Sequence, residues 1–430
     1  MTFLRLRAKD FRAKLGAFVG TGEASPDVRD AVAGIIADVK RRGDAAVLAY
    51  TAKFDRAKLT AARQRIPLAE LRRAAASFAP AKKKAFDEAA KCVTAFHART
   101  LPKGWTAPNP HGATVGERHH AIRRCGLYIP GGQVPLVSTV LMTALPAKVA
   151  GVPELCACTP PGPDGKINPD ILAALYLCGV TEVYAVGGAQ AVAAMALGTR
   201  TIAPVDKIFG PGNTFVTEAK RQVFGLVGVD LLPGPSEVMI IADRTARAEW
   251  VAADLCAQAE HGSGKEKLYL VTESEAFAKQ CLNAARKQSA TLTHGEKIRK
   301  ALDAKVCAIL VPKIEDAAEA ANLVAPEHLE LMVAPAKLKA LSARITTAGA
   351  ILLGHHTPTV LGDFTAGPSH TLPTGGTGRF FSGLRVADFL RRTSLVHYAP
   401  ASLKKAAAVV DAFARMENLD AHGRSLKVRL

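Results

Sequence analysis

The chain has 430 residues, of which 49% are apolar and 22% charged, a composition typical of a globular protein with two or three domains. Its 56 Lys and Arg residues exceed its 38 Asp and Glu residues, which gives a formal net charge of +18. No apolar run approaches the roughly 18–20 residues that span a membrane, and the N-terminus has no apolar signal segment. We therefore expect a cytoplasmic protein with no membrane contact.

The excess of positive charge favours either a nucleic acid or an anionic small molecule as the binding partner. The basic residues are dispersed, and the richest runs are only residues 40–42 and 82–84. No zinc finger, RNA-binding motif or aromatic-interleaved basic patch accompanies them, so we expect no nucleic-acid partner. The eight cysteines include no CxxC motif, which is typical of reduced thiols in a cytosolic protein.

In chain order, residues 1–22 form a short arm, and apolar residues then recur at helical spacing over 26–55, with an interruption at Gly43. Residues 67–99 are Ala-rich and also predict helix. From GLYIP onward, segments rich in Val, Ile and Leu alternate with Ala-rich helices up to GAILLG at 349–354, a pattern typical of βαβ units. A Gly-, Pro- and Thr-rich region at 367–383 precedes a helical tail. The sequence thus predicts an α/β fold with two open sheets and an arm at each end.

Three Gly-rich turns each lie between an apolar segment and a helix: GLYIPGG at 126–132, VGG at 186–188 and FGPGN at 209–213. Such turns can hold phosphate on backbone N–H groups, although any one of them can be purely structural. None matches GxGxxG with an acidic residue about twenty positions later. Together, the three turns favour a dinucleotide or phosphate crevice.

Potential metal ligands and proton-transfer groups are scattered from residue 258 to residue 422. Gln258 and His261 lie three apart in a predicted helix and so leave the same face, where they could either bind zinc or face solvent. In APEHLE, Pro326 suits the first position of a helix, which would put Glu327 and His328 in its first turn. There they could serve acid/base chemistry, or the Glu could simply stabilise the helix dipole.

Other polar residues are less informative one by one. Asp363 in LGDF, and Glu417 and His422 in MENLDAH, complete the set of potential ligands and proton-transfer groups. Ser236 lies just before a predicted strand, where a turn hydroxyl is the simpler interpretation. The adjacent pairs 119–120 and 355–356 are both His-His, and neighbouring side chains in extended chain point to opposite faces. We therefore treat both pairs as non-ligands.

Taken together, these segments resemble the histidinol dehydrogenases. The resemblance covers nearly the whole chain, in order. It is carried by RRGDAAVLAYTAKFD, GLYIPGGQVPLVSTVLMTALPAKVAGV, VGGAQAVAAMALGT, VDKIFGPGNTFVTEAKRQVFG, GPSEVMIIAD, AQAEHG, APEHLEL, AGAILLG, TPTVLGDFTAGPSHTLPTGGTGRF and AHGRS. It implies a zinc-dependent enzyme that oxidises L-histidinol to histidinal and then to L-histidine with two NAD. Small departures are Ser369, where Asn is usual, and Phe364, where Tyr is usual.

The resemblance also implies a role for each matching residue. Glu327 and His328 match the acid/base pair. The zinc ligands, which also contact substrate, match Gln258, His261, Asp363 and His422, the last supplied by the partner subunit. Further substrate contacts match Ser236, His328, His370 and Glu417. The NAD contacts match Tyr128, Gln190 and Asn213.

The expected organisation is a domain-swapped homodimer with shared active sites, built from two Rossmann-like α/β domains with helical arms. One domain is discontinuous, 23–125 and 236–381, and carries the metal and catalytic residues. The other, 126–235, contacts NAD. Residues 1–22 are the N-terminal arm, and 382–430 are the tail that reaches the partner. An alternative function is that of a paralogous zinc- and NAD-dependent dehydrogenase of another amino or sulfonated alcohol.

Overall fold

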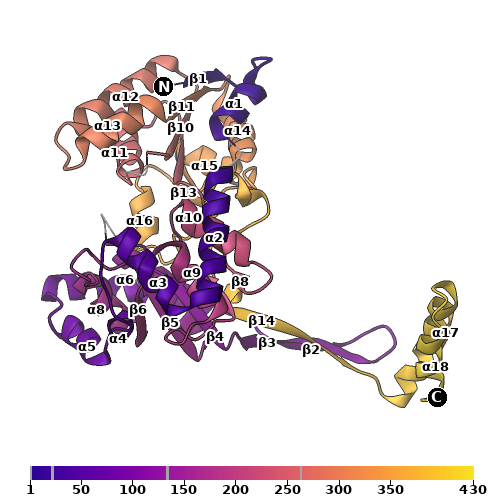
Figure 1. Cartoon of the computed structure of the whole chain (residues 1–430). Helices are drawn as coiled ribbons and strands as arrows, with labels where there is room; N and C mark the ends of the chain where they lie inside the picture. Colours follow the sequence, from indigo (N-terminus) through magenta and orange to yellow (C-terminus); the bar gives the residue numbers. More distant parts are fainter. Residues whose placement is uncertain (1, 21–23, 132–134, 262–263) are drawn as a thin grey trace.

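The computed structural model of the chain describes residues 2–20, 24–131, 135–261 and 264–430. Two α/β bodies lie one above the other, and a thin arm leaves the lower one and ends in a pair of helices (Figure 1). Within the described ranges, no helix combines the length and the apolar character needed to cross a membrane.

The upper body is built on a six-stranded sheet in which every pair of neighbouring strands is parallel. Its four central strands are buried along nearly their whole length, as expected for parallel strands covered by helices on both faces. In spatial order the strands are β1 (Thr2–Arg5), β11 (Val306–Leu310), β10 (Lys267–Thr272), β9 (Glu237–Ala242), β12 (His328–Met332) and β13 (Ala350–Leu353).

Helices cover both faces of this sheet. The helices that share a core with one face are α11 (Ala248–Ala259), α12 (Glu275–Ser289) and α13 (Gly295–Ala304). Those on the other face are α1 (Phe11–Val19), α14 (Ala317–Val324) and α15 (Pro335–Ala343).

Side chains of β12 alternate between the two cores. Leu329 and Leu331 join the core of α1, α14 and α15, whereas Met332 joins the core of α11. Because strand side chains point alternately to opposite faces, His328 and Glu330 share the face of Met332 and α11.

The N-terminal segment does not form a separate arm. Residues 2–5 form the edge strand β1, in which Thr2 is opposite Cys307 and Arg5 is opposite Leu310. Helix α1 then packs Phe11 against the same sheet. The expectation of an arm over 1–22 is therefore wrong for the described part of that segment.

The lower body contains a five-stranded parallel sheet. Its strands, in spatial order, are β6 (Glu182–Ala185), β5 (Glu154–Thr159), β4 (Arg124–Tyr128), β7 (Lys207–Phe209) and β8 (Gly228–Val229). On one face lie α5 (Leu68–Ala76), α6 (Pro80–Arg99), α7 (Val137–Val149) and α8 (Pro169–Leu177). On the other lie α2 (Pro26–Arg42), α3 (Asp44–Tyr50), α9 (Gly188–Leu197) and α10 (Thr214–Val223).

This packing differs from the expected division of the chain. Helices α2, α3, α5 and α6 share their buried side chains with the five-stranded sheet, not with the six-stranded one. Residues 26–99 therefore belong to the lower body, and the six-stranded sheet is built from β1 and from strands between 237 and 353. The sequence of a mainly helical segment does not indicate which sheet the helices cover, since their apolar faces can pack on either sheet.

The arm is a three-stranded antiparallel sheet in which β3 (Thr114–Ala121) pairs with β2 (Trp105–Pro108) and β14 (Leu390–His397). Its far end is fastened by a hydrogen bond of 2.9 Å from Asn109 Nδ2 to Tyr398 Oη. The chain continues into α17 (Pro400–Met416) and α18 (Asp420–Lys427), which lie beyond the arm and away from both bodies (Figure 1).

The described residues contain six further short helices. They are η1 (Thr51–Asp55), α4 (Ala61–Gln64), η2 (Ile314–Asp316), α16 (Thr359–Phe364), η3 (Thr377–Arg379) and η4 (Val386–Phe389). Helix α16 matters most for the site, since it lies between the two bodies (Figure 1). After it, Ser369 Oγ donates a hydrogen bond of 3.1 Å to the carbonyl of Met142 in α7, which ties this segment to the lower body.

Candidate active site

The residues of APEHLE enter a strand, not a helix. Ala325 adopts the left-handed conformation at φ 52, and β12 begins at His328. The predicted helix beginning at Pro326 is therefore wrong. The side chains of the run HLELM point alternately into two cores. Their burial in the sheet outweighs the preference of the proline for the first position of a helix.

Glu327 lies buried immediately before β12. Its Oε2 accepts a hydrogen bond of 2.8 Å from the backbone N–H of Glu237, the first residue of the neighbouring strand β9. Burial raises the pKa of the Glu327 carboxyl to about 7, although His328 and the Glu237 N–H both act to lower it. A carboxyl with this pKa can accept and release a proton near neutral pH. Ser236, the residue directly before that donor, is half-buried.

His328 lies between two carboxylates. Its Nδ1 is 3.8 Å from Glu327 Oε2, and its Nε2 is 3.6 Å from Asp363 Oδ1 in α16. Burial alone would lower the pKa of this imidazole, but the two carboxylates outweigh it and raise the pKa to about 9. Both ring nitrogens are thus directed at acidic partners, a geometry suited to moving a proton.

The carboxylate of Asp363 interacts with three imidazoles, those of His328, His370 and His261. Burial would raise its pKa, yet the hydrogen bond and charge of His328 and the charges of His370 and His261 together lower it. Conversely, burial lowers the pKa of His370, while Asp363 acts to raise it. His370 Nε2 is also 3.2 Å from Ser138 Oγ in α7 of the lower body.

Gln258 and His261 lie at the end of α11. Gln258 is buried, and its Nε2 has no hydrogen-bond partner within the described ranges. The helix ends at Ala259, so His261 follows the last turn and does not share a helical face with Gln258 as expected. Surrounding protein atoms lower the pKa of His261, and Asp363 acts to raise it, which puts these two side chains within electrostatic reach of each other.

In the described part of the chain, no three His, Cys, Asp or Glu side chains form a metal site. The reason is visible in where the expected ligands lie. Asp363 and His261 are near each other and Gln258 contributes an amide, but His422 is exposed on α18 at the far end of the arm. Glu417 follows α17 in the same remote position. One chain therefore brings together Gln258, His261, Asp363 and the acid/base pair, but not the two tail residues.

The other group of expected residues lines a cavity of about 1110 Å³ in the lower body. Tyr128 ends β4 and its hydroxyl accepts a hydrogen bond of 3.1 Å from the N–H of Gly188, while burial raises its pKa to about 12. Gln190, in the first turn of α9, is 0% exposed, and neither atom of its amide has a partner in the described ranges. Asn213 caps α10 through its Oδ1, which accepts from the N–H groups of Phe215 and Val216.

A buried ion pair between Lys220 and Asp230 holds the turn before Asn213 in place. Lys220 Nζ donates 2.8 Å to the carbonyl of Gly210 and pairs with Asp230, whose Oδ2 accepts 2.7 Å from the N–H of the same glycine. Gly210 has φ +113, and a Cβ there would lie 2.1 Å from the carbonyl oxygen of Tyr128. Only glycine suits this close approach of the turn to β4.

Asp55 is a cavity residue that the sequence did not single out. It ends η1 and lines the same wall as Tyr128 and Gln190. Burial raises its pKa to about 6, and its Oδ2 has no hydrogen-bond partner in the described ranges. The sequence offered no signal, because Asp55 follows a predicted helix like any surface acid. Gly132, in the first Gly-rich turn, lies outside the described residues.

Two contacts bring the cavity and the acid/base pair toward each other. Neither Glu327 nor His328 lines the cavity, although Asn213 does. Lys265, after α11, contacts Thr214, the residue next to Asn213, at 3.5 Å. Together with the contact between His370 and Ser138, this joins the segments that follow α11 and α16 to α10 and α7 of the lower body.

Comparison with known proteins agrees with this arrangement of residues. The sequence profile described as histidinol dehydrogenase matches residues 21–430. The histidinol dehydrogenase of Ruegeria pomeroyi is 45% identical over 429 residues, covering 100% of this chain and 98% of that protein, and that of Rhodospirillum rubrum is 46% identical, with 99% and 98% covered. The chain belongs to the histidinol dehydrogenase family. A crystal structure of histidinol dehydrogenase from Elizabethkingia anophelis superposes with a TM-score of 0.93 at 34% identity, covering 100% of this chain and 98% of that one.

Membership of the histidinol dehydrogenase family makes the chain an oxidoreductase of histidine biosynthesis that acts on an alcohol and then on an aldehyde. Of the two departures from the family pattern, Ser369 is buried and bonded to Met142, so it fastens a loop to α7. Phe364 is exposed at the end of α16, one residue after Asp363.

Proposed function

We propose that the chain oxidises L-histidinol to histidinal and then to L-histidine, using two NAD, with one zinc ion per subunit as substrate anchor. The observation that carries this proposal is the position of His328 between Glu327 and Asp363, next to the end of α11. Such a site offers a base, an acid that titrates near neutral pH and a set of metal donors.

The donor set fits zinc. An amide oxygen, imidazole nitrogens and a carboxylate are ligands that a borderline ion accepts. The amide of Gln258 is buried, and its Nε2 has no partner within the described ranges, so no protein bond to that nitrogen fixes the amide with its Oε1 turned away from a metal. We assign Gln258, His261 and Asp363 of one chain and His422 of a second copy as the ligands. When bound, zinc would hold the donor nitrogens of the substrate and polarise its hydroxyl.

His328 would remove the hydroxyl proton in the alcohol step. At a pKa of about 9 it holds its proton at neutral pH, because two carboxylates flank it. A cation held by Asp363 would cancel one of these two interactions and so lower the pKa of His328 toward neutrality. The metal ligand set and the base are therefore linked through one carboxylate.

Glu327 would activate water in the aldehyde step. Its pKa of about 7 lets it take a proton from water at neutral pH. Its Oε2 is fixed by the N–H of Glu237, so its orientation is set by the sheet before substrate arrives. Ser236, which precedes Glu237 in the chain, and His370, whose charge interacts with that of Asp363, are assigned as substrate contacts together with Glu417 of a second copy.

The cavity in the lower body fits NAD. Its sheet has the strand order of a doubly wound nucleotide-binding half, in which the reversal between β4 and β7 leaves a crevice at the carboxyl ends of the strands. Tyr128, Gln190 and Asn213 lie at that edge, and the unpartnered amide of Gln190 has donors and acceptors to offer. When bound, NAD would accept the hydride that leaves in each step.

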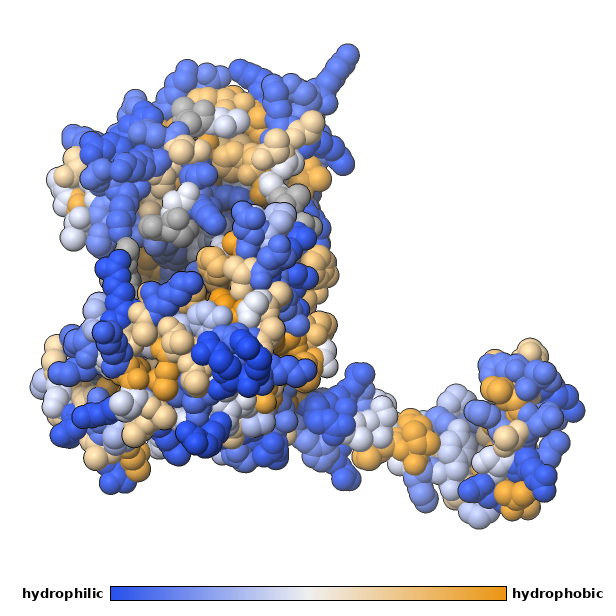
Figure 2. Space-filling model, viewed as in Figure 1, coloured by the Kyte–Doolittle hydropathy of each residue, from blue (hydrophilic) through white to orange (hydrophobic). Residues whose placement is uncertain are grey.

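A second copy of the chain is needed to complete this site. The tail exposes apolar side chains at helical spacing, namely Val409, Phe413 and Met416, and Figure 2 shows apolar surface on the tail and at the end of the arm. Exposed apolar stripes of this kind are typical of protein interfaces. We infer a domain-swapped homodimer in which each tail reaches the body of the other subunit.

The test is a stoichiometric assay with purified protein. Two NADH formed per L-histidinol, abolished by a chelator and restored by zinc, would support the proposal. One NADH per histidinol would contradict the two-step reaction. Turnover of another amino or sulfonated alcohol but not of histidinol would instead support a paralogous dehydrogenase.

A further inference from the structure

Two carboxyl groups that take no part in the proposed reaction lie behind the metal-site residues. Glu330 is on β12, two positions after His328 on the same face of the strand, and is 1% exposed. Asp254 is on α11, four residues before Gln258 on the same face of the helix. Asp254 is half-buried, and placing an acid beside the buried Glu330 is costly unless the oxygen atoms of both are satisfied.

Glu330 fastens the start of α16. Its Oε1 accepts hydrogen bonds from both the backbone N–H of Thr359, at 2.7 Å, and the hydroxyl of Thr359, at 2.6 Å. Thr359 is the first residue of the helix that carries Asp363 one turn later. A helix of six residues has little stability of its own, so its direction depends on how its first turn is held.

Asp254 acts on Glu330 from α11, whose side chains share a core with this face of β12. Burial and the neighbouring carboxylate of Glu330 raise the pKa of the half-buried Asp254 to about 8. Glu330 Oε2 is buried and has no hydrogen-bond partner among the described residues, so it is open to a proton carried by Asp254. One shared proton would let the two carboxyl groups stay together.

We propose that Glu330 and Asp254 are positioning residues that join β12, α11 and α16, and so hold His328, Gln258 and Asp363 in register for metal binding. This inference rests on the proposed zinc site. Supporting groups behind metal ligands typically affect metal affinity by about 10–100-fold. Neither residue is assigned a contact with substrate or metal.

A general loss of stability is the competing explanation, and Asp243 provides the matched control. Asp243 is a buried acid at the end of β9, the strand next to β12. Its oxygens accept from the N–H of Thr245 at 2.8 Å and the N–H of Ala334 at 3.0 Å. It therefore joins loops as Glu330 does, but loops that carry no proposed ligand.

The experiment measures zinc affinity by competition with a chromophoric chelator, using metal-free full-length protein, alongside thermal unfolding of the same samples. Glu330→Ala should weaken zinc binding by about 10–100-fold, while Asp243→Ala should lower the unfolding temperature and leave zinc binding near wild type. Glu330→Gln and Asp254→Asn should both restore affinity, since an amide can replace either member as acceptor or donor. Asp254→Leu should not.

If Glu330→Ala fails to fold, Thr359→Val supplies the same test with a smaller change, because it removes only the hydroxyl donor to Glu330. It should weaken zinc binding several-fold, and wild-type affinity in this variant would overturn the inference. So would equal affinity in wild type, Glu330→Ala and Asp254→Leu. A wild-type chain that binds no zinc would overturn the proposed function and this inference with it.

Discussion

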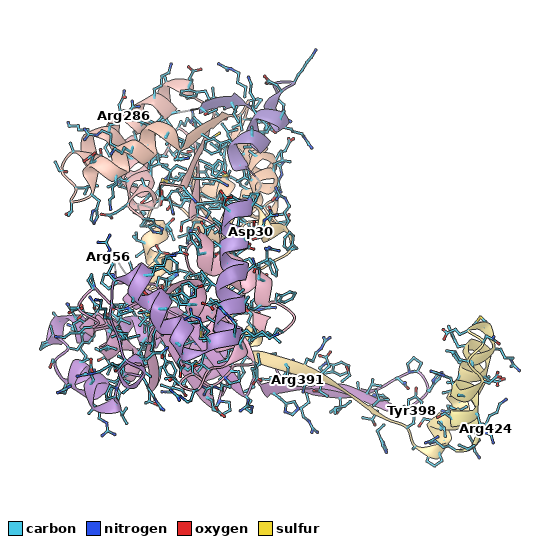
Figure 3. All side chains as sticks on the ribbon, viewed as in Figure 1. Asp30, Arg56, Arg286, Arg391, Tyr398 and Arg424 are labelled. Atoms are coloured by element: carbon cyan, nitrogen blue, oxygen red, sulfur yellow. The ribbon has the colours of Figure 1, made fainter. Side chains whose placement is uncertain are left out.

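Two groups of residues assigned to one site are held in opposite ways. Glu327, His328 and Gln258 are buried and fixed by the sheet and by α11. Glu417 and His422 are exposed on the tail, beyond the arm on which Figure 3 labels Arg391 and Tyr398. The first group is arranged by the folding of one chain, whereas the second lies far from that site in its own chain, as the proposed exchange of tails between two chains requires.

This difference separates two kinds of chemistry. The body carries the groups to which we assign proton transfer, and these are held by contacts such as the hydrogen bond from the N–H of Glu237 to Glu327. The tail would supply one metal ligand and one substrate contact, so the site closes only when two chains associate. Substitutions in the body should therefore damage reaction steps, and substitutions in the tail should damage binding.

The largest effect is expected for His328→Ala. Loss of a general base typically costs about 10²–10⁴-fold in rate, and both oxidations should fall because His328 takes the proton in the alcohol step and flanks Glu327 in the other. The measurement is kcat with histidinol and with histidinal. His355→Ala is the control: its Nε2 lies 3.1 Å from Thr245 Oγ1, and it should retain wild-type rates. Unchanged kcat in His328→Ala would exclude its role.

His422→Ala should act on binding and not on folding. We expect zinc affinity to fall by about 10–100-fold and the KM for histidinol to rise, while the unfolding temperature of the metal-free protein stays unchanged, since His422 is exposed. Chelator competition measures the zinc affinity, steady-state kinetics the KM, and calorimetry the unfolding temperature. A drop in unfolding temperature with zinc affinity intact would contradict the assignment.

Glu327→Gln should separate the two steps. Histidinal oxidation should fall by about 10²-fold or more, while histidinol oxidation changes less, because only the former needs activated water. In the wild type, the rate of the aldehyde step should rise with pH through about 7, as the Glu327 carboxyl ionises. The variant should lose this part of the pH profile. Equal loss in both half-reactions would contradict the assigned role.

The same substitution has an effect on stability with a defined sign. The pKa of Glu327 is raised in the folded protein, so the folded state holds more protons than the unfolded state between pH 4.5 and about 7. The unfolding temperature of the metal-free wild type should therefore fall across this range relative to Glu327→Gln. A difference between the two that does not change with pH would contradict the burial of an ionisable carboxyl.

The smallest effect is expected for Gln190→Leu. The side chain is fully buried with an unpartnered amide, so an apolar side chain of similar size should raise the unfolding temperature of the NAD-free protein. The KM for NAD should rise by about 10-fold, in line with one or two lost hydrogen bonds. Tighter NAD binding in this variant would exclude Gln190 as a cofactor contact.

The sequence predicted those parts of the fold that depend on local patterns. The alternation of apolar segments and Ala-rich helices correctly indicated parallel sheets, and the helical tail is present as α17 and α18. The strand β1 was missed because a four-residue segment shows no periodicity, and its partner lies at residues 307–310. The start of β12 was mistaken for a helix because Pro326 marks a boundary without specifying the type of element after it.

Recognition of the candidate site depended on residues matched to a family, and its supporting contacts depended on the structure. Spacing alone left Gln258 and His261 open to a solvent-exposed interpretation. Nothing in the sequence connects Glu330 with Thr359 or Asp254, because these contacts join three elements far apart in the chain. Asp55 was missed because the cavity that it lines is formed by segments far apart in the chain.

The shared site, which combines the body of one chain with the tail of another, is tested most directly by purified heterodimers. A heterodimer of His328→Ala with His422→Ala subunits retains one intact site if the tail acts on the partner. It should show about half of wild-type activity, whereas a heterodimer of the double variant with wild type has no intact site and should be inactive at a zinc concentration that saturates only intact sites. The reverse pattern, activity only in the second heterodimer, would show that each tail serves its own chain and would contradict the shared site.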